Sequence, residues 1–127
     1  MHLLVQQADT IFFQSIDVYH SINSIYPKDS NPYLTGFPKL LFEKNWIDCI
    51  QWHVEDEIRY PKINPEYALV LKRYIDNINQ KRTDIVEIMD DFFLNYFSNN
   101  FNNKNLLSNT ESPAWAFDRL SILCLKI

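Results

Sequence analysis

Three pairs of polar residues have the spacing of metal ligands on a helix. Each pair is three residues apart, and the pairs are Asp17 and His20, His53 and Asp56, and Glu87 and Asp90. Residues at this spacing lie one turn apart on the same helix face, and helical bundles hold metal ions with such pairs from facing helices. The last two pairs are our candidate metal site. Carboxylate-rich sites suit hard cations, so the cofactor expected there is Mg²⁺ or Mn²⁺.

A long helix over residues 65–97 is predicted to position Glu87 and Asp90. Its apolar residues follow one another at alternating steps of three and four, which is the spacing of a helix face that packs on a partner. At a rise of about 1.5 Å per residue the helix would be about 50 Å long. Asn64 is the predicted N-cap, because its side chain can accept a hydrogen bond from the first turn.

Arg82 stands in the apolar face of this helix, where an aliphatic residue is expected. A buried charge is costly unless it is paired and hydrogen-bonded. We therefore expect Arg82 to pair with a carboxylate from another helix, Asp56 or Asp118. The alternative is that the face opens to water and the Arg82 side chain extends past it.

Three further helices complete an all-α prediction. Apolar residues at helical spacing and proline or cap signals predict helices over 3–23, 38–59 and 112–127. We expect a single helical domain over residues 1–127: a four-helix bundle, most simply up-and-down, with one long central helix. The expected core residues are Ile47, Ile50, Val54, Leu71, Ile75, Ile78, Ile85, Met89 and Leu123.

Composition excludes several classes of function. The net charge is −4 and the basic residues are scattered, so no nucleic-acid partner is expected. Gly36 is the only glycine, which excludes dinucleotide fingerprints, P-loops and the G-x-S-x-G elbow. Cys49 and Cys124 lie at apolar helical positions, so we expect buried, reduced thiols and no covalent catalysis. Without a basic leader or a long apolar run, we expect no membrane span and a cytoplasmic location.

Three segments resemble an uncharacterised bacterial family, domain of unknown function 4254. They are WIDCIQWHVEDEIR, LKRYIDNINQKRTDIVEIMDDFF and NTESPAWAFDRLSILCLKI. The resemblance runs from Tyr19 to Ile127 and implies a small helical protein without an established activity. It also implies that family members continue past the LKI segment. We therefore expect a shortened member, whose exposed apolar helix face a protein partner or a second copy of the chain would cover.

The resemblance also implies a set of polar positions that fall on every predicted helix. If one face of each helix points inward, these residues would share a polar centre. The candidate members are Asp17, His20, His53, Glu55, Asp56, Asp76, Asn79, Arg82, Asp84, Glu87, Asp90, Asp118 and Arg119.

Three interpretations of these polar residues remain open. The first is an interaction or scaffold protein that binds a partner chain through aromatic residues and arginines. The second is a network of buried ion pairs that fixes helix register. The third is a divalent-metal-dependent hydrolase of phosphorylated or nucleotide substrates, by analogy to all-helical nucleotide pyrophosphohydrolases. That analogy lacks the usual first E-x-x-E, because Trp52 stands three residues before Glu55. We take the interaction protein as the main hypothesis and the hydrolase as the alternative.

Overall fold

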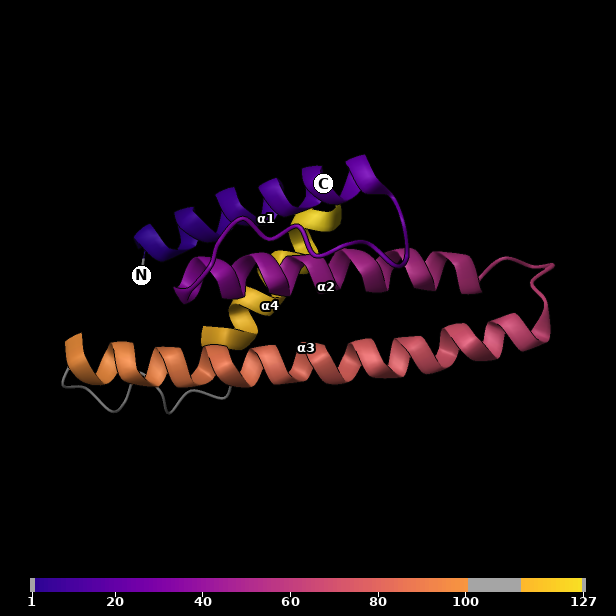
Figure 1. Cartoon of the computed structure of the whole chain (residues 1–127). Coiled ribbons are helices and arrows are strands. Elements are labelled where there is room, and N and C mark those ends of the chain that lie inside the picture. The colour runs from indigo at the N-terminus through magenta and orange to yellow at the C-terminus, as the bar shows by residue number, and fades with distance from the viewer. Residues whose placement is uncertain (1, 101–112, 127) are drawn as a thin grey trace.

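Residues 2–100 and 113–126 are described by the structure, and they fold into four helices with no strand among them. Figure 1 shows the computed structural model, with α1 (His2–Ile22), α2 (Gly36–Ile58), α3 (Pro65–Asn100) and α4 (Pro113–Lys126). Each boundary lies within three residues of the predicted one. The prediction of an all-α bundle with one long helix is confirmed, since α3 alone has 36 residues.

Local signals in the sequence set the ends of these helices. Asn64 caps α3 as predicted: its side-chain oxygen accepts hydrogen bonds from the backbone N–H of Glu66, at 2.8 Å, and of Tyr67, at 3.4 Å. Asn23 follows α1 with φ at 50°, the left-handed conformation that often ends a helix. Gly36 starts α2 with φ at 80°, which a residue with a side chain adopts only under strain.

The helix α2 lies in the middle of the bundle. It packs along α1 on one side and α3 on the other, while α4 crosses obliquely and contacts all three (Figure 1). A short turn makes α2 and α3 antiparallel, as predicted. However, α1 and α2 run in the same direction, because the segment 23–35 returns along the bundle before α2 begins. The simple up-and-down path is therefore wrong.

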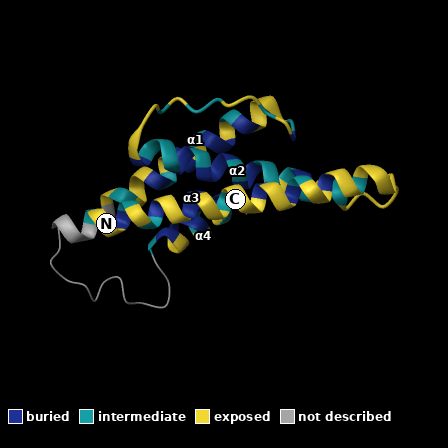
Figure 2. Ribbon diagram, turned by 60° about the horizontal axis from the view of Figure 1, so that its bottom comes forward, coloured by how far each residue is buried: buried dark blue, intermediate teal, exposed yellow. Residues whose placement is uncertain are grey.

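Apolar side chains form two clusters along this arrangement. The larger cluster joins α1, α2, the second half of α3 and α4, and its fully buried side chains include Phe12, Phe42 and Phe93. The smaller cluster lies between the end of α2 and the start of α3, where Ile25 covers it from the loop. Figure 2 shows the resulting alternation of buried and exposed positions along the helices.

Most of the predicted core is confirmed. Val54, Leu71, Ile75, Ile78, Ile85 and Met89 are buried, and Ile47 and Ile50 are partly buried against both clusters. Leu123 is the exception, with 56% of its surface exposed. The helix α4 turns Asp118, Ser121 and Cys124 inward, and Leu123 lies about 200° around the helix from Ser121. The prediction for Leu123 is therefore wrong.

None of the helices in the described ranges combines the length and the apolar character needed to cross a membrane.

Two leucines near the start of α3 test this packing. Leu71 is fully buried, whereas Leu69, two residues earlier, is 52% exposed. Leu71→Ala should lower the free energy of unfolding by about 2–5 kcal/mol, because it leaves a cavity in the smaller cluster. Leu69→Ala should change it by less than about 0.5 kcal/mol. Urea unfolding followed by circular dichroism measures both, and equal effects would contradict the assignment of this face.

Candidate functional site

Four charged side chains from three helices meet inside the bundle. The Lys44 ammonium contacts Asp48 on its own helix and lies 2.9 Å from Asp118 Oδ1 on α4. Arg82 on α3 donates two hydrogen bonds to Asp118, at 2.9 and 2.8 Å, and lies 3.5 Å from Asp48 Oδ1. Two cations therefore face two carboxylates, and the charges of this four-residue network cancel.

Neutral polar groups complete the network. The Ser121 hydroxyl donates to Asp48 Oδ2 at 2.6 Å, and the Asn45 amide donates to the Ser121 hydroxyl at 3.0 Å. Lys44, Asn45 and Ser121 have no exposed surface. Buried charges are tolerated when they are paired and hydrogen-bonded, and both conditions are met here.

The two carboxylates have opposite pKa shifts. Burial raises the pKa of Asp48 above its ordinary value, although Lys44, Ser121 and Arg82 act in the other direction. Burial would also raise the pKa of Asp118, but the charges and hydrogen bonds of Lys44 and Arg82 outweigh it and lower that pKa. Asp118 is the carboxylate that takes both hydrogen bonds of the guanidinium.

The pairing of Arg82 with another helix is confirmed, and Asp118 rather than Asp56 is the partner. Sequence reasoning missed Lys44 and Asp48. The signal was available, because the buried positions Phe37 and Leu41 continue at steps of three and four into these two residues. The same spacing had identified Arg82.

Three hollows adjoin α2, the first on its α3 side and the second on its α1 side at the same level of the helix. The first, of about 200 Å³, has Asp48 and Arg82 in its wall and is also lined by Trp52 and Leu125. The second, of about 250 Å³, shares Trp52 and Leu125 and adds His53. The third, of about 690 Å³, shares His53 with the second and extends over the turn between α2 and α3.

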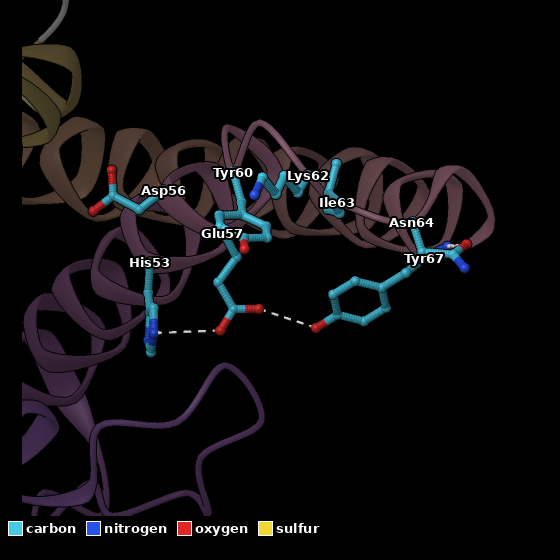
Figure 3. A pocket seen from close by; sticks show the side chains of 8 residues that line it. All are labelled: His53, Asp56, Glu57, Tyr60, Lys62, Ile63, Asn64 and Tyr67. Atoms are coloured by element: carbon cyan, nitrogen blue, oxygen red, sulfur yellow. Dashed lines mark hydrogen bonds and ion pairs between the residues drawn. The ribbon is translucent and has the colours of Figure 1, made fainter.

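A chain of hydrogen-bonding groups runs from α1 into the third hollow. The Tyr19 hydroxyl lies 2.8 Å from His53 Nδ1 and donates to the Ser24 carbonyl at 2.7 Å. His53 Nε2 is 3.7 Å from Glu57 Oε1, and Glu57 Oε2 accepts a hydrogen bond from Tyr67 at 3.0 Å (Figure 3). This hydrogen bond to the carboxylate raises the pKa of the Tyr67 hydroxyl.

The four candidate metal ligands are not brought together. Asp48 meets Arg82, and Gln51 lies 2.8 Å from Asn79, which fixes the antiparallel register of α2 and α3. His53 is five residues beyond Asp48, and Glu87 is five residues beyond Arg82 in the opposite direction, so about 15 Å of helix separates them. Among the described residues, no group of three His, Cys, Asp or Glu could hold a metal ion.

The other members of the expected polar centre are not in the four-residue network, although Glu55 lines the first hollow together with Arg82. Asp56 pairs with Arg59, Asp76 with Lys72, Asp84 accepts a hydrogen bond from Gln80, and Glu55 and Asn79 both contact Gln51. Asp17, His20, Glu87 and Arg119 are exposed, and Asp90 is half-buried.

The environment of the two cysteine thiols does not activate either of them as a nucleophile. Cys49 and Cys124 are buried, as predicted. Burial raises the pKa of Cys49 to about 12 and that of Cys124 to about 11. Both groups therefore stay protonated at neutral pH, and a protonated thiol is a poor nucleophile.

Two lysines on α2 provide a matched test of the network. Lys44→Met should lower the free energy of unfolding by about 3–5 kcal/mol, because it leaves two buried carboxylates with one cation. Lys39 also pairs with an acid four residues later, Glu43, but on the surface, with 45% of the lysine side chain exposed. Lys39→Met should cost less than about 1 kcal/mol. Chemical unfolding measures both, and a small loss for Lys44→Met would contradict the network.

The opposite pKa shifts predict opposite effects of two aspartate variants on acid stability. Since the folded pKa of Asp118 is lowered, its stabilisation is present above the unfolded value of 3.8 and is lost as the pH falls through the folded pKa. The folded pKa of Asp48 is raised instead, so protonation of Asp48 favours the folded state as the pH falls. Between about pH 7 and pH 3, Asp118→Asn should therefore flatten the loss of stability, and Asp48→Asn should steepen it. Urea unfolding at a series of pH values decides this; a change in the same direction for both variants would contradict it.

The comparisons with known proteins give a family and no activity. No curated protein and no solved structure matches the chain. Residues 38–127, which include nearly all of α2, the helices α3 and α4 and the whole four-residue network, match the family described as "Protein of unknown function (DUF4254)". The match covers more than half of the sequence, and the chain therefore belongs to this family.

Proposed function

We propose that this protein is an interaction module that holds a helix of a partner protein across α2 at Trp52. The observation that carries the proposal is the position of Trp52, which is 43% exposed and stands between two hollows that it shares with Leu125. Tryptophan is among the residues that most often contribute a large part of the binding energy at protein interfaces.

The size of the hollows favours side chains over a small molecule. Pockets for small ligands have volumes of about 300–1,000 Å³. The two hollows beside Trp52 have volumes of about 200 and 250 Å³. They lie on either side of Trp52 at the same level of α2, so a partner helix that crosses α2 there could place a side chain in each, as amphipathic helices do in grooves.

The charge of this surface selects the kind of partner. Its walls contain Glu55 and Glu57 against a single lysine, Lys62, and a third acid, Asp56, that pairs with Arg59. The charges of Asp48 and Arg82 are already balanced within the network. The surface is therefore acidic, and complementarity favours a basic amphipathic helix.

The hydrolase alternative finds no support. Its carboxylate pairs lie at separate positions along the two helices, and the description of the family names no activity.

A synthetic amphipathic helix of leucine and arginine residues, about 18 residues long, tests the proposal. The wild-type protein should bind it, as followed by isothermal titration calorimetry. Trp52→Ala should weaken binding about 30-fold, the loss typical of a central interface residue. Trp115→Ala is the matched control, since Trp115 is 42% exposed but lies on α4 outside the three hollows.

Two further measurements identify the occupant. An equivalent helix of leucine and glutamate should bind at least about tenfold more weakly if the acidic walls select the partner. Sedimentation of the protein alone reports self-association. A dimer that Trp52→Ala dissociates would make a second copy the occupant and overturn the proposal, and so would equal effects of the two tryptophan variants.

A further inference from the structure

The third hollow has a composition that the interaction surface beside Trp52 does not explain. It is the largest of the three, at about 690 Å³, and lies over the turn between α2 and α3. Figure 3 shows His53, Glu57 and Tyr67 in a row along it, with Asp56 pointing away from Glu57. The row presents an imidazole, a carboxylate and a phenol to the same space.

Hydrogen-bond geometry fixes which nitrogen of neutral His53 carries the proton. The Tyr19 hydroxyl has one hydrogen, and it is directed to the Ser24 carbonyl at 2.7 Å, because a carbonyl only accepts. The Tyr19 oxygen must then accept from His53 Nδ1, which lies 2.8 Å away. Neutral His53 is therefore protonated on Nδ1, and Nε2 keeps its lone pair.

This tautomer leaves two acceptors side by side without a donor between them. His53 Nε2 lies 3.7 Å from Glu57 Oε1, and in the neutral ring neither atom has a hydrogen to offer the other. The second oxygen of Glu57 is occupied by the Tyr67 hydroxyl at 3.0 Å. His53 Nε2 and Glu57 Oε1 therefore remain free to accept hydrogen bonds from a group in the hollow that both residues line.

We infer that this hollow binds an alkylguanidinium group, the head group of an arginine on the partner helix. A guanidinium has several N–H donors in one plane, so it can donate to His53 Nε2 and Glu57 Oε1 together. The exposed rings of Tyr60 and Tyr67 line the same hollow and attract cations through their faces. The inference rests on the proposed function only for the source of the arginine.

Lys62 also lines the hollow and is the one cation in its wall. Its charge opposes that of an incoming guanidinium. Removal of this charge should therefore strengthen binding of the guanidinium, whereas a variant that disturbs the structure of the turn would weaken it. The two effects have opposite signs, which makes Lys62→Ala informative.

Free ethylguanidinium tests the site without a partner protein. In a titration followed by the ring ¹⁵N and ¹H signals of His53, it should give a saturable shift. Tetramethylammonium, which has the same charge and no N–H, should give no comparable shift.

Glu57→Gln should weaken ethylguanidinium binding at least about tenfold, since it removes a charge-assisted acceptor. Asp56→Asn, the matched loss of a neighbouring carboxylate, should have a much smaller effect, and Lys62→Ala should strengthen binding.

Two other variants separate this inference from the proposed function. Trp52→Ala should weaken binding of the leucine–arginine helix but leave binding of ethylguanidinium unchanged. Glu57→Gln should weaken the binding of both. Tyr19→Phe removes the acceptor at Nδ1, so it should move the ring proton toward Nε2 and weaken ethylguanidinium. Equal shifts with the two organic cations, or an unchanged affinity in Glu57→Gln, would overturn the inference. A stronger response to Mn²⁺ or Mg²⁺ than to ethylguanidinium would overturn it in favour of a metal site.

Discussion

The pairing of Asp48 and Asp118 with Lys44 and Arg82 is the constraint on which the rest of the fold depends. Each charge would be expensive to bury alone, and the set is tolerated because every member has a partner of opposite sign. The partners come from three helices. A shift of α3 or α4 by one turn would leave buried charges unpaired, so the network specifies the register of the bundle more strictly than apolar contacts, which accept many neighbours.

This constraint also explains the orientation of α4. A helix with Leu120, Ile122, Leu123 and Leu125 has several apolar faces that it could bury. The network requires Asp118 and Ser121 to point inward, and that choice leaves Leu123 on the surface. The hydrophobic pattern alone therefore gave the wrong face for one residue, because the polar interactions of the helix decided its rotation.

The sequence predicted what depends on local patterns. Helix ends, the Asn64 cap and the buried face of α3 follow from spacing and side-chain chemistry between near neighbours, and Arg82 was found because it interrupts that spacing. The parallel course of α1 and α2 was not predictable in this way, since it depends on how the segment 23–35 packs back on the bundle. The contact of His53 with Tyr19 on α1 likewise depends on tertiary packing, whereas its contact with Glu57 is a local one between residues one turn apart on α2.

The helix α2 therefore carries two kinds of polar residue: those that stabilise the fold through the buried network, and those that line a hollow at the surface. On its inner face, Lys44 and Asp48 are held by ion pairs and hydrogen bonds within the network. On its opposite face, neutral His53 and Glu57 present two acceptors side by side, because Tyr19 determines the tautomer of the imidazole. These two acceptors are partly exposed and lie beside an exposed tryptophan, so water can donate to them in the free protein. The basic amphipathic helix that we propose would replace this water with a donor that has apolar neighbours.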